Sequence, residues 1–488
     1  MNIKTPFHIF TIGWSTSLIK DILVPIGLKE GIIFTHGLIS NQEAELFEDL
    51  GDPHCVYMGF ADGDQLPPPD YDLLASIESV GVPTVRTMIL GDRVLRNRPE
   101  KEALSYVTLL VHRLKAFFLK YQPDLVLGSF DQVHGMLGLA VAKSLGIPWV
   151  CMSFTVIPEN LTGFCRGLTP NTLLDGLASP VDSSFRQIST RVMEDFRRKN
   201  MKIFVFRPPT SAGERLRQLN PFILALWRRL VFSHRYNRFV FPSVIERIAD
   251  VVRRTFNALT VPSDKYISVP SGRRFVFFPL QMKPEMSTET QAPFFQDQLS
   301  LVRQLCDALP IDVDFVVKLH LSDPDNYSRK QLGRIMNFPN VKIAHPSSSS
   351  FSFLERASMI IGITGTPCLE AALLGKPVLL FGDSPYVHFP SSERAKRPDE
   401  WYQQIRRMLD MPPPSDEDIV VAFATYIARY MPGRINDWSK PIEEEELARL
   451  TECFSKLRAF VDKPGNRANW YSMPPFLSEQ SSNTSDFS

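Results

Sequence analysis

The sequence has few cysteines, no long apolar run and almost no net charge. Its six cysteines are far apart and form no Cys-x-x-Cys pair, so neither a zinc site nor a disulfide framework is expected, and a reducing cytosol fits. No apolar run reaches the roughly 18–20 residues that span a bilayer, and Met1–Lys20 lacks the apolar centre of a signal peptide. A formal net charge of +1 excludes a strong overall field for nucleic acid. We therefore expect a cytoplasmic protein with no nucleic-acid partner.

The 488 residues exceed what one hydrophobic core usually supports, which predicts two lobes. Residues 1–180 alternate short apolar runs with helical stretches, as in a parallel α/β sheet. The same pattern resumes over 266–410. Beyond it we predict C-terminal helices over 411–471 and a disordered tail over 472–488.

Residues 181–265 differ from both lobes and predict a basic helical insert. Between Gly213 and Thr255 there are nine arginines against three acidic residues, with aromatic side chains between them. Two interpretations remain open. The insert is either a helical element with a solvated basic face, or a surface for an anionic lipid or an anionic glycan.

The strongest local motif is Gly-Ile-Thr-Gly-Thr-Pro-Cys-Leu-Glu over 362–370, followed by Gly-Lys-Pro. A strand ending near Ile363 and a helix beginning at Thr366 would aim free backbone N–H groups at one point. Together with the helix dipole, these groups form an anion site. Gly365 would let a phosphate approach the backbone, Thr364 and Thr366 would add hydroxyl donors, and Glu370 could hold ribose hydroxyls. The alternative is an ordinary strand-to-helix turn.

This loop resembles the donor loop of GT-B glycosyltransferases and of the related non-hydrolysing sugar-nucleotide epimerases. The wider block is similar to bacterial capsule polysaccharide biosynthesis proteins. Four pieces carry the resemblance: Phe-Phe-Pro-Leu-Gln at 277–281 with Pro-Glu-x-Ser-Thr at 284–288, Val-Lys-x-His at 317–320, Ser-Ser-Ser-Phe at 348–351, and the loop through Asp383. The resemblance implies an α/β fold of two Rossmann-like lobes facing across a cleft, with the donor on the C-terminal lobe.

The resemblance also implies donor-binding residues. His320 would face the donor phosphates, where a positively biased imidazole could stabilise the departing nucleotide. The remaining implied positions near the donor are Gln281, Glu285, Ser287, Thr288, Lys318, Ser348, Ser349 and Ser350. Lys-Leu-His-Leu at 318–321 departs from the Lys-Glu-His-Pro expected of the family. The nucleotide-sugar would be a substrate, so no cofactor and no metal are expected.

Transfer to a hydroxyl needs a base, which we expect from the N-terminal lobe. Asp131 and His134 follow a predicted strand that ends at Gly128, and His36 follows a predicted strand over 32–35. Such positions lie at the carboxyl edge where open α/β sheets bind ligands. The loop over 13–17 is a further candidate for acceptor contact, and Asp-Gly-Asp at 62–64 is interpreted as a turn rather than a metal site.

These observations predict a metal-independent transferase that moves a sugar from a nucleotide-sugar donor to a surface glycan or glycolipid. It would be cytoplasmic, and if the insert binds anionic lipid it would be peripheral on the inner face of the membrane. Two alternatives stay open: a non-catalytic glycan- or nucleotide-binding partner in capsule assembly, and a sugar-nucleotide epimerase.

Overall fold

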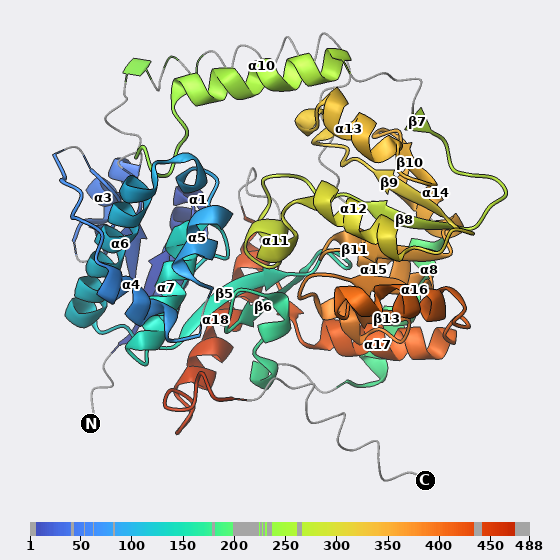
Figure 1. The fold of residues 1–488 in the computed structure, drawn as a ribbon. Helices are drawn as coiled ribbons and strands as arrows, with labels where there is room; N and C mark the ends of the chain where they lie inside the picture. The colour runs from blue at the N-terminus through green and yellow to red at the C-terminus, as the bar shows by residue number, and fades with distance from the viewer. Residues whose placement is uncertain are drawn as a thin grey trace. The chain divides into compact units, whose positions relative to one another are not determined.

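A computed structural model gives the architecture (Figure 1). It describes residues 6–40, 43–52, 54–61, 63–81, 83–177, 181–198, 224, 227, 230–231, 237–260, 266–433 and 442–473. The chain forms two compact units. Unit 1 comprises 1–180, 228–242 and 427–488, and unit 2 comprises 181–227 and 243–426.

Unit 1 is built on a seven-stranded sheet of order β14-β6-β5-β4-β1-β2-β3. Its strands are β1 (Phe7–Ile12), β2 (Ile32–Leu38), β3 (Cys55–Tyr57), β4 (Leu125–Leu127), β5 (Trp149–Phe154), β6 (Leu161–Cys165) and β14 (Met431–Pro432). The run from β3 to β5 is parallel, whereas β6 pairs antiparallel with both β5 and β14. The order 3-2-1-4-5 reverses direction between β1 and β4, which defines a topological switch point there.

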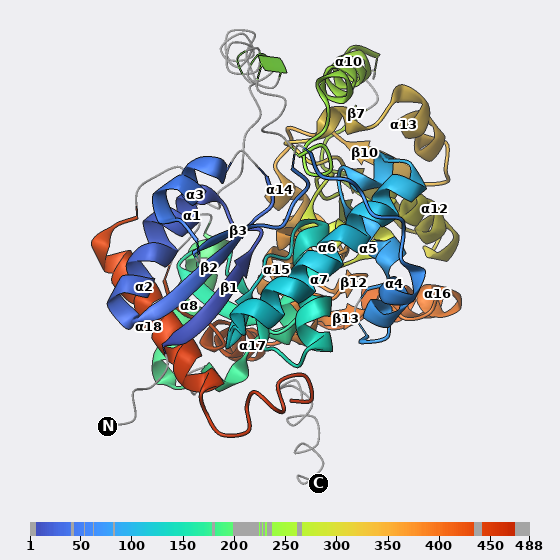
Figure 2. The ribbon, with the colours of Figure 1, turned by 90° about the vertical axis from the view of Figure 1, so that its left-hand side faces the viewer.

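Helices pack on the sheet of unit 1 (Figure 2). They are α1 (Thr16–Leu18), α2 (Val24–Glu30), α3 (Ala44–Leu50), α4 (Tyr71–Glu78), α5 (Val85–Gly91), α6 (Glu100–Tyr121), α7 (Gln132–Ser144) and α18 (Glu444–Val461). A single π-helical turn, Ile19–Leu23, joins α1 to α2. α18 returns to this unit because Leu450, Phe454 and Leu457 belong to the same buried cluster as Phe34 of β2.

Unit 2 carries a second seven-stranded sheet, and all of its strands are parallel. The order is β13-β12-β11-β8-β9-β10-β7. The strands are β7 (Tyr266–Ile267), β8 (Phe275–Pro279), β9 (Asp314–Lys318), β10 (Val341–Ala344), β11 (Met359–Gly362), β12 (Val378–Leu380) and β13 (Ser392–Arg394). From β10 to β13 this is the 3-2-1-4-5-6 order of a Rossmann fold, with its switch point between β8 and β11.

The central strands of unit 2 are buried on both faces, which is why their sequences read as continuous apolar runs such as Phe-Val-Phe-Phe and Met-Ile-Ile. The helices of this unit are α8 (Ser183–Arg197), α10 (Val244–Thr260), α11 (Met286–Glu289), α12 (Gln298–Ala308), α13 (Arg329–Met336), α14 (Ser350–Arg356), α15 (Thr366–Leu373), α16 (Trp401–Leu409) and α17 (Asp416–Ala428), the last ending at the boundary with unit 1.

The expected α/β fold of two Rossmann-like lobes is confirmed, but the expected boundaries need correction. Residues 181–265 are not a separate insert, because α8 and α10 belong to unit 2 and residues 228–242 to unit 1. The predicted C-terminal helices over 411–471 are likewise divided between the units. Of the predicted tail, Met473 packs against the core of unit 1, and residues 474–488 lie outside the described residues. None of the described helices is both long and apolar enough to cross a membrane.

Candidate nucleotide-sugar site

The predicted donor loop lies at the switch point of unit 2. β8 and β11 are adjacent and parallel, so the loops that follow them leave the same edge of the sheet side by side. The first loop carries Gln281 and the second carries Thr364 and Gly365. In open α/β sheets this crevice is where ligands bind. The motif in the sequence identified the second loop and the family resemblance implied the first, and the sheet order places the two loops side by side.

Gln281 ties the two loops together. Its side-chain oxygen accepts from the N–H of Thr364 (3.2 Å), while its amide nitrogen donates to the hydroxyls of Ser287 (2.7 Å) and Thr364 (3.2 Å). The hydroxyl of Thr364 in turn donates to the Ser287 carbonyl (3.1 Å). Gln281 is itself held by Gln298 of α12, whose side chain bonds the Gln281 N–H (2.8 Å) and carbonyl (3.0 Å). These bonds fix the loop before any ligand arrives.

Gln298 was missed by sequence reasoning. Gln298 is 1% exposed in α12, and the residues around it in the sequence do not predict that its side chain contacts the loop after β8. The only signal in the sequence is a glutamine at helical spacing from the apolar residues Leu301, Val302 and Leu305 of α12.

The start of α15 presents unpaired backbone donors. Gly365 is the N-cap residue, Thr366 is the first helical residue, and Pro367 stands at the second position, where its missing N–H costs nothing. Within the described part of the chain, the N–H groups of Gly365 and Thr366 have no hydrogen-bond partner. The Thr364 N–H, by contrast, is already taken by Gln281. Two N–H groups at a helix N-terminus suit an oxyanion.

Close packing positions this turn. A Cβ added at Gly362 would lie 2.1 Å from the Cys368 sulfur, and one at Gly382 would lie 2.4 Å from a Thr364 methyl. Both glycines therefore let α15 and its loop approach the sheet. Gly365 differs, because its φ of −66° is ordinary and an added Cβ would meet Gln281 at 3.5 Å, a normal contact. The backbone conformation at position 365 therefore does not require a glycine. The remaining physical reason for a glycine is the space that it leaves for a ligand.

Glu370 lies one turn into α15 and is half-buried. Burial raises the pKa of its carboxyl group to about 7. None of the described residues donates a hydrogen bond to this side-chain carboxyl group. An unbonded carboxyl group just inside this helix is consistent with the expected ribose contact, which stays a prediction.

His320 and Lys318 differ from expectation. The Nδ1 atom of His320 accepts from the Ser322 N–H (3.1 Å), and burial together with the nearby Lys318 charge lowers the pKa of the imidazole. The ring is therefore favoured as a neutral group whose Nε2–H can donate, rather than as the expected cation. Lys318 is 4% exposed and donates to the Pro346 carbonyl (2.9 Å), so it joins the loops after β9 and β10 instead of reaching a donor. Burial lowers its pKa to about 8.

The other predicted donor contacts divide. Thr288 is wrong as a ligand contact, because it is fully buried and its hydroxyl bonds the Glu285 carbonyl (3.0 Å). Glu285 is half-buried at the N-cap of α11. Ser348, Ser349 and Ser350 follow β10, which is separated from β11 by two strands, but helix α14, which begins at Ser350, contacts α15. Contact of those serines with the same phosphate stays a prediction.

At the switch point of unit 1, the loop after β1 packs on the loop after β4. Gly13 has a φ of +77°, and an added Cβ there would lie 2.5 Å from the Ser129 hydroxyl. Trp14 donates its ring N–H to the Leu127 carbonyl (2.9 Å). Asp131, at the start of α7, forms an ion pair with Arg93 (3.1 Å) while 40% of its side chain stays exposed. Burial raises the pKa of Asp131, and Arg93 opposes that shift. Asp131 thus remains a candidate base.

The prediction that His36 and His134 act as bases is wrong. Strand β2 extends to Leu38, so His36 lies inside the strand, where its ring is 1% exposed and bonds the Thr11 hydroxyl (2.8 Å). His134 is 1% exposed beneath α6 and its Nε2 bonds the Tyr106 hydroxyl (2.7 Å). Burial lowers the pKa of both rings to about 3. Neither can take a proton from a ligand at the sheet edge.

Glu43 was not considered from the sequence, although it follows β2 at the same edge. Its carboxylate accepts from the N–H groups of Ile39 (2.9 Å) and Ser40 (3.4 Å). Burial raises its pKa to about 7, which suits a general base near neutral pH. The signal was a lone Glu five residues beyond the end of β2 at Leu38, which is too common to single out.

No group of three or more His, Cys, Asp or Glu side chains in the described ranges is placed to hold a metal ion. In the Asp-Gly-Asp segment, Asp62 lies outside the described residues. Asp64 accepts from the Ala61 N–H (2.7 Å) and pairs with Arg113 (2.9 Å). Its bonds are those of a turn, as expected.

Among sequence relatives, Protein FixF of Sinorhizobium fredii is 29% identical over 124 residues. The match covers 25% of this chain and 30% of FixF, so this chain accounts for less than a third of that relative's length. No protein-family model matches the chain.

Solved structures similar to the chain include both transferases and epimerases. The beta Kdo 2,7 transferase of Thermosulfurimonas dismutans KpsC is 13% identical at a TM-score of 0.36, covering 92% of this chain and 99% of that one. The glycosyltransferase SnogD of Streptomyces nogalater is 15% identical at a TM-score of 0.24, covering 93% of this chain and 100% of SnogD. The UDP-GlcNAc 2-epimerase of Neisseria meningitidis is 13% identical at a TM-score of 0.28, covering 92% of this chain and 100% of the epimerase. These low TM-scores do not distinguish a transferase from an epimerase.

Proposed function

We propose that the chain is a glycosyltransferase that takes a sugar from a nucleotide-sugar donor bound at the switch point of unit 2. The observation that carries the proposal is the pair of unpaired N–H groups at Gly365 and Thr366, held at a helix N-terminus by the Gln281 bonds. The resemblance of the 277–383 block to capsule proteins suggests a surface glycan or glycolipid as the acceptor.

In the proposed reaction a carboxylate of unit 1 removes a proton from an acceptor hydroxyl, and the oxygen attacks the anomeric carbon of the sugar. The bond from that carbon to the phosphate oxygen breaks, and the nucleotide leaves with the electron pair. Charge that grows on the phosphate would be stabilised by the N–H groups of Gly365 and Thr366 and by a neutral His320 donating from Nε2. Asp131 and Glu43 are the candidate bases.

The test is calorimetric titration with UDP, GDP, CMP and TDP, using Gly365→Val against Gly333→Val. Gly333 lies in α13, and an added Cβ there meets no atom within 4 Å, so it serves as the matched control. We expect Gly365→Val to lose at least about tenfold in affinity, or roughly 1.4 kcal/mol, because its side chain would fill the space of a phosphate. Folded Gly365→Val with wild-type affinity would place the donor elsewhere and defeat the proposal.

A second candidate is a non-catalytic nucleotide-binding partner. It gains support because two of the three bases expected from the sequence, His36 and His134, are buried. Turnover separates the candidates: a transferase should release nucleotide in the presence of acceptor, and His320→Ala should slow that release more than it weakens binding. Nucleotide binding without release or epimerisation of any donor tested would favour the binding partner.

A further inference from the structure

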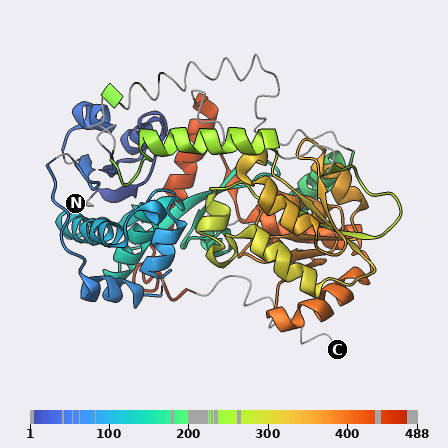
Figure 3. The ribbon, with the colours of Figure 1, turned by 45° about the horizontal axis from the view of Figure 1, so that its top comes forward.

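Helix α10 is one unbroken helix (Figure 3) that contacts the rest of unit 2 through its polar face. The buried Asn257 side chain donates to the Asp325 carbonyl (2.9 Å), and Arg253 donates to the Asn326 carbonyl (2.9 Å). Both carbonyls belong to the 3-10 turn Pro324–Asn326, which follows the loop after β9. The opposite face of α10 exposes apolar side chains, namely Ile245, Ile248, Val252, Phe256 and Leu259. Polar bonds therefore join α10 to the turn.

The arginines of the predicted basic insert are described only in part. Five of the nine lie outside the described residues, namely Arg215, Arg217, Arg228, Arg229 and Arg235. Arg238 pairs with Glu102 within unit 1 (3.5 Å), whereas Arg253 and Arg254 are directed to polar partners of unit 2. These three arginines thus serve contacts within the chain, and an anionic lipid or glycan as partner of the stretch stays a prediction.

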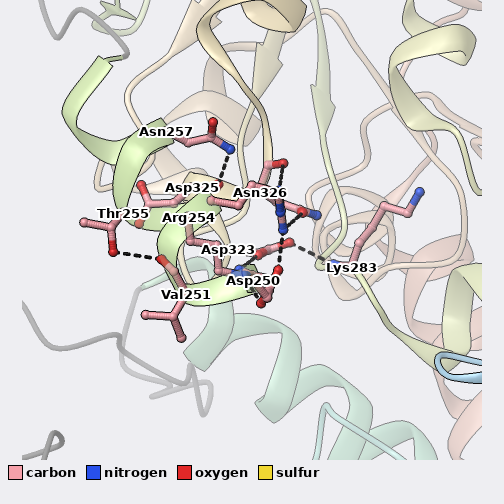
Figure 4. A network of polar contacts seen from close by, with 10 residues as sticks. Asp250, Val251, Arg254, Thr255, Asn257, Lys283, Asp323, Asp325 and Asn326 are labelled. Atoms are coloured by element: carbon pink, nitrogen blue, oxygen red, sulfur yellow. Dashed lines mark hydrogen bonds and ion pairs between the residues drawn. The ribbon is translucent and has the colours of Figure 1, made fainter. Parts of the chain in front are cut away.

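Asp323 is the buried centre of the contacts around α10 (Figure 4), with 3% of the residue exposed. One carboxylate oxygen pairs with the Arg254 guanidinium, and the other accepts from the Lys283 N–H (3.0 Å) in the loop after β8. The backbone N–H of Asp323 donates to the His320 carbonyl (3.1 Å). Arg254 is itself oriented by Asp250 on the same helix (2.9 Å). Asp323 therefore joins three segments: α10, the loop after β8 and the loop after β9.

His320 owes its orientation to the same turn. The Ser322 N–H donates to Nδ1 of the ring (3.1 Å), which leaves Nε2 as the protonated nitrogen of the neutral imidazole. Asp323 closes the turn one residue later, through its bond to the His320 carbonyl. The Asp323 carboxylate then fixes this turn against the loop after β8. The direction of the Nε2–H is therefore set by groups outside the His320 side chain.

The contribution of Asp323 to His320 is geometric rather than electrostatic. Burial and the Lys318 charge lower the pKa of His320, and the Asp323 carboxylate opposes that shift. Removing the carboxylate would therefore favour the neutral ring further, which is the form proposed to donate to the phosphate. A loss of turnover on that change would come from the position of the ring and not from its protonation.

We propose that Asp323 is a positioning residue for the transfer reaction, because its carboxylate, held by Arg254 of α10, fixes the turn that aims the His320 Nε2–H. This role rests on the proposed function, in which that N–H stabilises the departing phosphate. In the proposed reaction Asp323 touches no reacting atom. It acts through His320, and α10 acts through Asp323.

A double-mutant cycle tests the proposal. Asp323→Asn keeps the shape of the side chain, but its amide offers one acceptor oxygen where Lys283 and Arg254 require two. We expect nucleotide release in the presence of acceptor to slow by about tenfold, with nucleotide affinity changed less than about twofold. In the His320→Ala background the same substitution should change turnover by less than about twofold, since the group that Asp323 positions is absent.

Asp312→Asn is the matched control. This carboxylate also pairs with an arginine, Arg406 (2.9 Å), but it lies before β9, at the opposite end of the strand from His320. We expect wild-type turnover and affinity from it. Arg254→Ala is a second test variant and should reproduce the pattern of Asp323→Asn. If Asp323→Asn slows turnover equally with and without the His320 side chain, its role is structural and the proposal is overturned.

Nitrogen NMR of the histidines gives a readout that needs no turnover. The wild type should show His320 as the Nε2–H tautomer, identified by the signal that His320→Ala removes. Asp323→Asn should mix the two tautomers and so shift or broaden that signal, whereas Asp312→Asn should leave it unchanged. A wild type that releases no nucleotide would defeat the proposed function, and these signals would still decide whether Asp323 positions His320. An unchanged His320 signal in Asp323→Asn would overturn the proposal.

Discussion

At the scale of single residues, burial decides which acid–base groups can take part in chemistry. His36 and His134 have the right position in the sequence but lie in the core, whereas Glu43 and Asp131 are half-buried carboxyl groups at the edge of the sheet. Desolvation acts in opposite directions on the two kinds of group, lowering the pKa of an imidazole and raising that of a carboxyl group. The same physics therefore removes two candidates and supplies one.

Glu43 gives a prediction about the pH dependence of turnover. A base must be deprotonated to accept a proton, and burial raises the pKa of Glu43 to about 7. Turnover should therefore rise as the pH increases from 6 to 8. In Glu43→Gln this rise should disappear and turnover should fall by roughly 100-fold or more, with donor affinity little changed. Steady-state rates across this range check it. A Glu43→Gln profile like the wild type, with Asp131→Asn inactive, would assign the base to Asp131.

His134 gives a prediction about stability. Its folded pKa of about 3 lies below the ordinary 6.5, so the unfolded chain binds the proton more readily. The free energy of unfolding is then unaffected above pH 6.5 and falls as the pH drops below it, by at most roughly 1.4 kcal/mol per pH unit for this one group. His134→Gln should reduce that acid sensitivity. Urea titrations at pH 7.5 and pH 5 measure it, with the exposed His112→Gln as the control. If the free energy of unfolding falls equally between pH 7.5 and pH 5 in His134→Gln and His112→Gln, this account is contradicted.

At the scale of elements, turns and loops are held by a few buried polar groups. Gln281 and Gln298 hold the β8 loop against the β11 loop, and Asp323 joins the β9 turn, the β8 loop and α10. Removing one partner of such a set leaves the others desolvated without a bond, which costs more than the bond itself contributes.

Arg254 tests this at α10. Asp323 is 3% exposed, so Arg254→Ala leaves a buried carboxylate with one partner fewer. We expect a loss of about 1–3 kcal/mol in the free energy of unfolding, measured by urea denaturation. Arg253→Ala is the matched control, because the described partners of Arg253 are the 47% exposed Asp250 side chain (2.6 Å) and the carbonyl (2.9 Å) and side chain (3.3 Å) of Asn326, none of which is a buried carboxylate. Its effect should stay below about 1 kcal/mol. Similar losses of unfolding free energy in both variants would mean that the ion pair of Arg254 with Asp323 contributes no more to stability than the contacts of Arg253.

At the scale of the whole molecule, two Rossmann-type sheets each carry a switch point, between β1 and β4 in unit 1 and between β8 and β11 in unit 2. Unit 2 offers N–H donors at the Gly365 loop, and unit 1 offers the carboxylates Asp131 and Glu43. This division matches a reaction that needs an anion site for a leaving group and a base for an acceptor.

Metal independence is a prediction at this scale. If the N–H groups of Gly365 and Thr366 neutralise the phosphate charge, nucleotide affinity and turnover should change less than about twofold in excess EDTA. The measurement is titration and rate determination before and after chelation, with added Mg²⁺ and Mn²⁺ as the reverse arm. Activity that is lost with chelator and restored by either cation would show that leaving-group stabilisation needs a metal.

The sequence by itself determined the two α/β lobes and the turn at 362–370. Both depend on local patterns: apolar runs of strand length, a glycine at each turn, and a proline at the second position of α15. Such signals need no knowledge of distant residues.

Only the tertiary structure decided which residues meet at each site. It paired Gln281 with Thr364 across 83 positions of sequence, buried His36 and His134, and turned the apolar face of α10 outward. The physical reason is that burial and long-range hydrogen bonds depend on the order of strands in the sheet and on which helix face finds a partner. Hydrophobic periodicity reveals that a helix has an apolar face, and the surrounding packing determines whether that face is covered.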